Sequence, residues 1–175
     1  CVVECPMGAI SFQNQSQTTD TEKIGYALNA PLSTSCNGKI VLFLCSRSAA
    51  QAFKAVEFIY QDDVVVFEVN CAGSIEPQRI FDALKSGARG VLVGGCYKGN
   101  CASLYGNILC MGRIENIAGS RKEKAPQHEN SSVSPELLSV SDKNVLFNRI
   151  RFVQTAGNTP EVLVKAISEL GRLPV

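Results

Sequence analysis

The chain of 175 residues has a single histidine, His128, and no apolar run of the about 18 residues that a transmembrane helix requires. Because His128 lies in a polar segment, a Cys-His catalytic pair and a histidine-rich metal site are both disfavoured. The sequence also lacks a G-x-G-x-x-G motif and a P-loop, so nucleotide binding has little support. We therefore assign no catalytic residue.

An excess of charge of either sign is also missing. The chain has 17 Lys and Arg against 16 Asp and Glu, which gives a formal net charge of +1. Such a balance argues against nucleic acid or an acidic lipid surface as the partner. With 45% hydrophobic residues, the length suits one globular domain with a full core and some appended chain.

Cysteine, in contrast, is frequent. Eight cysteines are too few for the disulfide scaffold of a small secreted protein and many for a cytosolic one, so ligation of a cofactor is the favoured interpretation. The chain begins at Cys1 without an initiator Met, so we interpret it as a piece of a longer protein whose signal peptide cannot be judged.

The composition divides the chain into three parts. Residues 1–12 form a compact motif, residues 13–38 are a predicted linker rich in Gln, Thr and Ser, and residues 39–175 form a regular domain. A polar insertion is expected at 119–134, followed by a short helix beginning at Ser134.

The pattern from residue 39 onward predicts an α/β fold. Short apolar strands at 39–44, 64–70, 90–95 and 150–155 alternate with helices expected at 49–60, from a Ser74 N-cap to before Gly87, at 104–117 and from Pro160. This alternation predicts a four-stranded parallel sheet with helices on both faces, a flavodoxin- or Rossmann-like three-layer arrangement. We expect strand order 2-1-3-4, with the switch point between the first and third strands.

Four cysteines lie where these strands end. Cys45, Cys71 and Cys96 each follow a strand, and Cys101 lies five residues after Cys96. Since the carboxyl ends of parallel strands share one edge of the sheet, these four residues, called the edge cysteines below, should converge there. Two other cysteines, Cys36 and Cys110, are better explained as core or incidental residues.

By count alone, four thiolates suit a tetrathiolate zinc site and an iron-sulfur cluster equally well. The neighbouring glycines favour the cluster, because they allow close backbone approach and offer amides that can hydrogen-bond to sulfide. The predicted cofactor-binding glycines are Gly73, Gly94, Gly95 and Gly99.

The run from Val69 through Cys96 and Cys101 to Asn107 resembles the delta subunit of methyl-viologen-reducing hydrogenase, and a weaker likeness extends over about 39–170. The resemblance implies a 2Fe-2S cluster on the edge cysteines that passes electrons between a hydrogenase and heterodisulfide reductase. The family usually has C-x-x-C after its first strand, where this chain has Ser48 in the second position, so its ligand set could differ.

The opening segment from Cys1 through Cys5 to Ile10 resembles the end of a bacterial ferredoxin motif. The resemblance implies that Cys1 and Cys5 are ligands of separate 4Fe-4S clusters that the chain cannot complete alone. A ferredoxin segment joined to a delta-like domain is similar to fusions in the A-type subunit of heterodisulfide reductase and in the B-type subunit of the quinone-interacting oxidoreductase. Those fusions imply FAD and 4Fe-4S clusters in the full-length protein.

Three hypotheses follow. The chain is an electron-transfer module of a redox complex, a structural zinc or degenerate docking domain of such a complex, or a thiol-disulfide enzyme that uses Cys96 and Cys101. The third is the weakest, because redox pairs are usually spaced C-x-x-C. The expected partners are subunits of heterodisulfide reductase-like, hydrogenase-like, formate dehydrogenase-like or quinone-interacting complexes. The expected location is the cytoplasm, with attachment to a membrane only through partner subunits.

Overall fold

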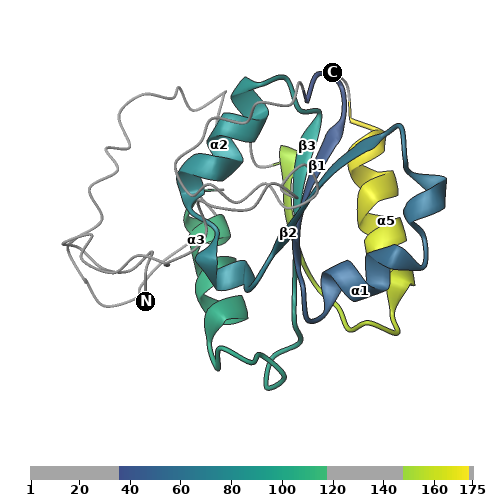
Figure 1. The fold of residues 1–175 in the computed structure, drawn as a ribbon. Helices are drawn as coiled ribbons and strands as arrows, with labels where there is room; N and C mark the ends of the chain where they lie inside the picture. Colours follow the sequence, from purple (N-terminus) through teal and green to yellow (C-terminus); the bar gives the residue numbers. More distant parts are fainter. Residues whose placement is uncertain (1–35, 118–147, 174–175) are drawn as a thin grey trace, which may run out of the picture.

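A parallel β-sheet forms the centre of the computed structural model, which describes residues 36–117 and 148–173 (Figure 1). Its strands are β1 (Ile40–Cys45), β2 (Val64–Val69), β3 (Gly90–Gly95) and β4 (Ile150–Gln154). They pair in parallel in the order β2-β1-β3-β4. The predicted fold class and strand order are therefore confirmed.

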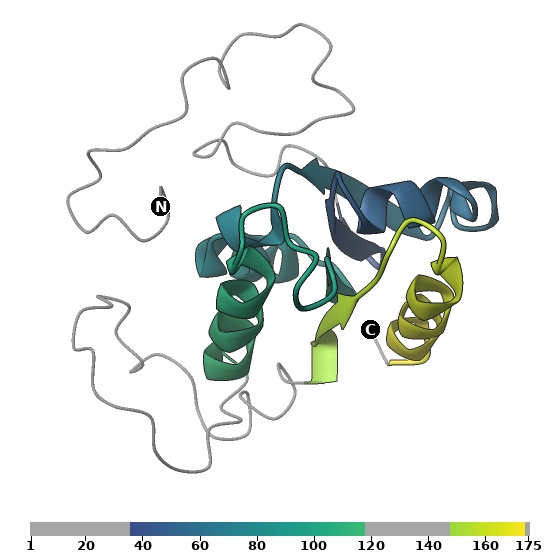
Figure 2. The same ribbon diagram turned by 90° about the horizontal axis from the view of Figure 1, so that it is seen from below.

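Helices cover both faces of the sheet. They are α1 (Ala49–Lys54), α2 (Pro77–Lys85), α3 (Gly106–Ile117) and α5 (Pro160–Gly171), with 3-10 turns η1 (Glu57–Ile59) and η2 (Ala72–Ser74). α2 and α3 lie on one face, and α1 and α5 on the other (Figures 1 and 2). Among the helices of the described residues, none has the length and apolar character that crossing a lipid bilayer requires.

The pleat of β1 divides the core into two layers. Val41 and Phe43 belong to the cluster under α2 and α3, whereas Leu42 and Leu44 belong to the cluster under α1 and α5. Because successive side chains of a strand point to opposite faces, Cys45 lies on the same face as Val41 and Phe43. The last residue of β1 is thereby directed towards the α3 side of the sheet.

The first helix is shorter than predicted. It ends at Lys54, and the backbone of Val56, at φ −127° and ψ 1°, leaves the helical region before the turn η1. Phe53 is buried, but Ile59, which a helix over 49–60 would place on the same side as Phe53 and Val56, is 53% exposed. After the break at Val56 the turn Glu57–Ile59 is exposed, whereas Tyr60 packs against the core again.

The second helix begins at Pro77, so the prediction of Ser74 as its N-cap was wrong. Glu76 is extended, at φ −80° and ψ 141°, as the residue before a proline usually is. Ser74 instead closes the turn η2, where its Oγ donates a hydrogen bond to the carbonyl of Cys71 at 2.7 Å. The structure thus uses this serine to shape the loop that carries Cys71.

Several expectations fall on parts of the chain that the structure does not describe. The ferredoxin-like segment 1–12, most of the predicted linker, the polar insertion and the helix expected at Ser134 lie outside the described residues. Residues 36–38 are described and lie against the domain, since Cys36 is fully buried and the Gly38 amide donates to the Gly87 carbonyl at 2.9 Å. The expectation that Cys36 belongs to the core is confirmed.

Candidate metal centre

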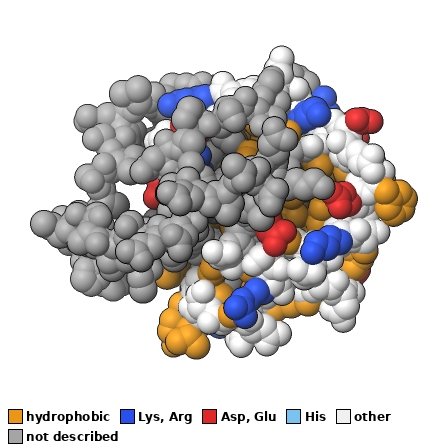
Figure 3. Space-filling model, viewed as in Figure 1, with side chains coloured by type: hydrophobic (Ala, Val, Ile, Leu, Met, Phe, Trp, Pro, Cys, Tyr) orange, Lys and Arg blue, Asp and Glu red, His pale blue; other side chains and the backbone are white. Residues whose placement is uncertain are grey.

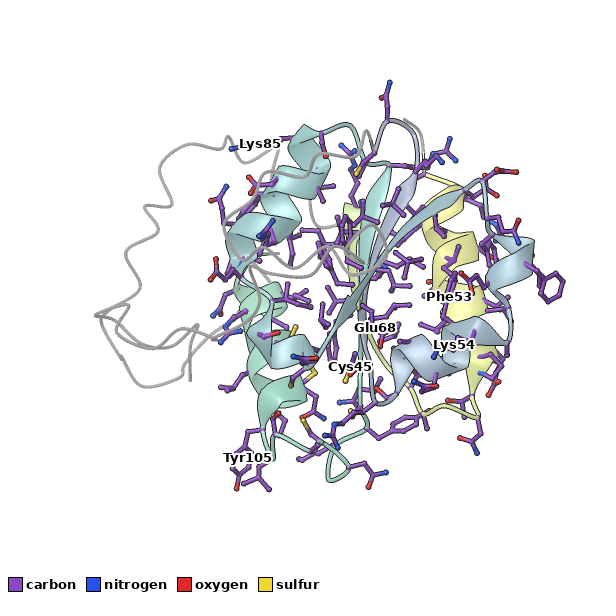
Figure 4. The ribbon with its side chains drawn as sticks, viewed as in Figure 1. Cys45, Phe53, Lys54, Glu68, Lys85 and Tyr105 are labelled. Atoms are coloured by element: carbon purple, nitrogen blue, oxygen red, sulfur yellow. The ribbon has the colours of Figure 1, made fainter. Side chains whose placement is uncertain are left out.

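The side chains of the edge cysteines lie together at the carboxyl ends of the strands. Cys45, Cys96 and Cys101 form a buried cluster, and the partly buried Cys71 packs against it. Figure 4 shows several yellow sulfur atoms gathered around Cys45, on the side of the sheet that α3 covers. The end of β1 and the segments that follow β2 and β3 therefore bring these thiols to one place.

The sulfurs are arranged as two pairs. The Sγ atoms of Cys45 and Cys96 are 3.7 Å apart. Cys71 and Cys101 meet at Gly106, because the sulfurs of both lie within contact distance of the position that a Cβ atom would take there. Each pair joins a cysteine at or just after one strand with a cysteine from the loop that follows β3.

The first pair has the spacing that a shared metal ion requires. Two thiolates bound at about 2.3 Å to one tetrahedral ion lie about 3.8 Å apart, close to the distance between Cys45 and Cys96. Within residues 36–117 and 148–173, no group of three His, Cys, Asp or Glu side chains is placed around a single ion.

The amino-terminal end of α3 stabilises one of the thiolates. Burial by itself raises the pKa of Cys101, but the backbone amides of Asn107, Ser103 and Gly106, together with the side chain of Cys71, outweigh burial and lower that pKa. Amides and the helix dipole both favour negative charge at this end of a helix. Cys101 is thus prepared to act as an anionic ligand.

Cys96 has the opposite tendency. Its pKa is raised by burial and by the neighbouring charges of Cys45 and Cys101, while the hydroxyl of Ser48 acts in the lowering direction. Several thiolates packed this closely repel one another, and a cation between them removes the repulsion. A metal ion bound at these sulfurs would therefore oppose the rise in the pKa of Cys96.

Gly106 makes room for the second pair. A Cβ atom at this position would clash with the sulfur of Cys71 and would lie 3.5 Å from the sulfur of Cys101. It is the first residue of α3, so the helix backbone itself forms one wall of the site. Sequence reasoning missed this role, although a glycine at the start of a predicted helix soon after a candidate ligand was an available signal.

Two polar side chains attach α3 to the cysteine loops. The buried Asn107 donates from Nδ2 to the carbonyl of Cys96 at 2.9 Å, and Arg113 donates from Nη1 to the carbonyl of Gly73 at 2.7 Å. They fix the helix to the loops after β3 and β2. Neither residue was assigned a function from the sequence, because their partners are backbone atoms distant along the chain.

The predicted cofactor-binding glycines have structural roles of their own. A Cβ atom on Gly94 would be 2.5 Å from the Cβ of Ala49, and one on Gly73 would be 2.6 Å from the Cα of Gly106. Gly99 has a φ of +87° and open space around it. The full set is Gly73, Gly94, Gly95 and Gly99. Contact between these residues and a cofactor stays a prediction.

The remaining cysteines divide into two groups. Cys36 and Cys110 are buried in the core layer under α2 and α3, as predicted. Cys1 and Cys5 lie outside the described residues, so their assignment to 4Fe-4S clusters stays a prediction. In the described part of the chain, all six cysteines are free thiols.

A family of known proteins matches the described domain. The family model of the methyl-viologen-reducing hydrogenase delta subunit matches residues 40–155, which is more than half of the chain. The matched region includes all of β1 to β4 and all four edge cysteines.

Individual relatives cover different shares of the chain. The iron-sulfur D-type subunit of an F420-non-reducing hydrogenase of Archaeoglobus profundus is 38% identical over 71 residues, which are 41% of this chain and 52% of the relative. The vhc iron-sulfur D-type subunit of the same kind of hydrogenase from Methanococcus voltae is 35% identical over 107 residues, 59% of this chain and 73% of the relative.

A third relative is much longer than this chain. The A-type subunit of the ferredoxin:CoB-CoM heterodisulfide reductase of Methanosarcina mazei is 32% identical over 87 residues, 48% of this chain but 11% of the relative. The chain thus spans about half of the Archaeoglobus relative and a small part of the Methanosarcina one.

Replacing Gly106 by Ala tests the packing at the site. We expect Gly106→Ala to lower the free energy of unfolding by about 1–3 kcal/mol, because the new methyl group clashes with the Cys71 sulfur. Gly112→Ala is the matched control in the same helix, since nothing lies within 4 Å of its Cβ position. The control should gain about 0.5–1 kcal/mol from helix propensity. Chemical denaturation measures both, and a stabilised Gly106→Ala protein would contradict the packing described here.

The thiol of Cys110 should be unreactive in the folded protein. Burial raises its pKa to about 12, so at pH 8 roughly one molecule in ten thousand carries the thiolate that reacts with alkylating reagents. Iodoacetamide labelling followed by peptide mass spectrometry should find Cys110 unmodified until denaturant is added. Rapid labelling of Cys110 in native protein would show that α3 is not packed on the sheet as described.

Proposed function

The chain belongs to the methyl-viologen-reducing hydrogenase delta subunit family, and from this premise we propose that it relays single electrons through a 2Fe-2S cluster held by the edge cysteines. The observation that carries the proposal is the grouping of these residues into two pairs, Cys45 with Cys96 and Cys71 with Cys101. A 2Fe-2S cluster is held by four thiolates, two for each iron.

When bound, such a cluster supplies a one-electron carrier in which one Fe(III) becomes Fe(II) on reduction and returns to Fe(III) on oxidation. The protein supplies the four ligands, a buried environment and hydrogen-bond donors. Amides of Ser103, Gly106 and Asn107 already favour the anionic form of Cys101, and such donors make a cluster easier to reduce.

The electron donor and acceptor are proposed to be redox centres of neighbouring subunits. The relatives' names describe subunits of hydrogenases and of a heterodisulfide reductase, so a place in a redox complex is the supported part of this assignment. The choice among hydrogenase-like, heterodisulfide reductase-like and quinone-interacting complexes stays a prediction. The same holds for a cytoplasmic location and for FAD and 4Fe-4S clusters in a longer protein.

Hydrophobic side chains are exposed on the loop that carries Cys101. Leu104 is 73% exposed and Tyr105 is 65% exposed, and Leu109 on the first turns of α3 is 46% exposed. In Figure 4 Tyr105 points outward beyond the site, and Figure 3 shows exposed hydrophobic side chains along the same lower edge of the molecule. We propose that the redox subunit that exchanges electrons with the cluster packs on this loop, because only a few residues separate its exposed side chains from Cys101.

The two other hypotheses have less support. A structural zinc ion would need all four thiols as ligands of one ion, whereas the sulfur contacts that the structure describes join them in two pairs. A disulfide enzyme based on Cys96 and Cys101 would need these two sulfurs in contact, but the sulfur that contacts Cys96 is that of Cys45. Both hypotheses remain measurable alternatives in the experiment below.

The proposal predicts an iron-containing protein. Purified without oxygen, the chain should contain about two irons and two acid-labile sulfides, and it should give an electron paramagnetic resonance signal after reduction. Cys101→Ala should lose most of the iron and the signal, because the cluster would lack a ligand. Cys110→Ala is the control, since it removes a buried thiol of the same domain outside the proposed ligand set.

The alternatives give different results. Stoichiometric zinc without sulfide, or a metal-free protein with a reversible two-electron thiol titration, would overturn the electron-relay proposal. Equal iron loss in Cys101→Ala and Cys110→Ala would show that iron content reports only the integrity of the fold.

A further inference from the structure

Ser48 occupies the N-cap position of α1 without capping the helix. Its hydroxyl makes no hydrogen bond to the first turn, although serine is among the residues that usually do so. The backbone of Ser48 is fully engaged, with its amide donating to the Cys45 carbonyl at 3.1 Å and its carbonyl accepting from the Ala52 amide at 3.0 Å. The backbone groups of Ser48 are therefore both hydrogen-bonded, and only its side-chain hydroxyl is not.

That side chain is buried and unsatisfied. Ser48 is 4% exposed, and its Oγ has no hydrogen-bond partner within the described residues. Buried hydroxyl groups nearly always have a partner, and an exception often marks the place of a bound group. The backbone amide of Ser48 is bonded to the carbonyl of Cys45, whose sulfur lies 3.7 Å from that of Cys96, and the Ser48 hydroxyl acts to lower the pKa of Cys96. The unused donor therefore faces one of the two sulfur pairs.

We propose that Ser48 Oγ donates a hydrogen bond to the sulfur of Cys96 when the cluster is bound, and that this hydrogen bond raises the reduction potential of the cluster. The proposal rests on the 2Fe-2S assignment above. A hydroxyl carries one donor hydrogen, and four thiolates together with the two sulfides of the cluster would complete the coordination of both irons, so Ser48 serves as a donor and not as a fifth ligand. Ser48 therefore acts on the cluster through the Cys96 sulfur without binding iron. Hydrogen-bond donors to cluster sulfur stabilise the reduced and more negative state.

The test compares Ser48→Ala with Ser46→Ala. Ser46 is half-buried in the same loop, which makes its variant a control for the loss of a nearby hydroxyl. Both proteins and the unsubstituted chain are purified without oxygen, and iron, sulfide and the midpoint potential are measured by redox titration with paramagnetic resonance detection. We expect Ser48→Ala to keep its iron and to shift to a lower midpoint potential, and Ser46→Ala to match the unsubstituted chain.

A second measurement detects the hydroxyl proton of Ser48 directly. Electron-nuclear double resonance of the reduced cluster in H2O and D2O should detect an exchangeable proton that is absent from Ser48→Ala and present in Ser46→Ala. In the metal-free state Ser48→Ala should melt no lower than the unsubstituted chain, because it removes a buried hydroxyl that has no partner.

The outcomes separate this inference from the proposed function. Iron-free unsubstituted protein would overturn both. An iron-containing protein whose potential and exchangeable proton are unchanged in Ser48→Ala would overturn the Ser48 inference alone. Loss of iron from Ser48→Ala would overturn the donor role in favour of direct ligation, and an equal shift in Ser46→Ala would show that the potential does not depend on this hydroxyl.

Discussion

The candidate centre depends on the register in which β1 pairs with its two neighbours. Cys45 lies opposite Val69 of β2, and Leu44 lies opposite Gly94 of β3, so the three strands end within a few residues of the same level. Cys71 and Cys96 then follow directly from their strands into one space. A slip of one residue would turn Cys45 to the opposite face of the sheet, towards α1 and α5.

This register alone would give a group of buried thiols, which is not yet a metal site. The contribution of α3 is to lower the pKa of one of these thiols and to leave space for the sulfur of another. The helix begins at Gly106, where the missing side chain admits the Cys71 sulfur, and the nearby amides lower the pKa of Cys101. Asn107 holds this helix end to the Cys96 carbonyl. The same few residues therefore set the geometry and the charge of the second sulfur pair.

The sequence was sufficient for the features that arise from local patterns. Apolar runs bounded by cysteines located the strands and their ends, and the crossover rule together with an assumed order placed those ends side by side. It was insufficient where a contact joins distant segments. Three such features depend on how α3 and α1 pack on the sheet: the hydrogen bond from Asn107 to Cys96, the closeness of Gly106 to Cys71 and the burial of Ser48.

The wrong predictions also arise from contacts between distant segments. A helical pattern continued past Lys54 in the sequence, but the chain must return to begin β2 and leaves the helix at Val56, as tertiary context commonly imposes on weak propensities.

The loop after β3 places a buried cysteine close to exposed apolar side chains. Cys101, a proposed ligand of the cluster, is 8% exposed, yet Leu104 three residues later is 73% exposed. Leu104 has a φ of 58°, a left-handed conformation that costs a non-glycine residue about 1–2 kcal/mol. Its amide donates to the carbonyl of Cys101, so the unfavourable backbone is part of the turn that begins at this cysteine. A turn this tight keeps the sulfur inside the protein while the next side chains reach solvent, and it thereby keeps the path between a buried centre and the surface short.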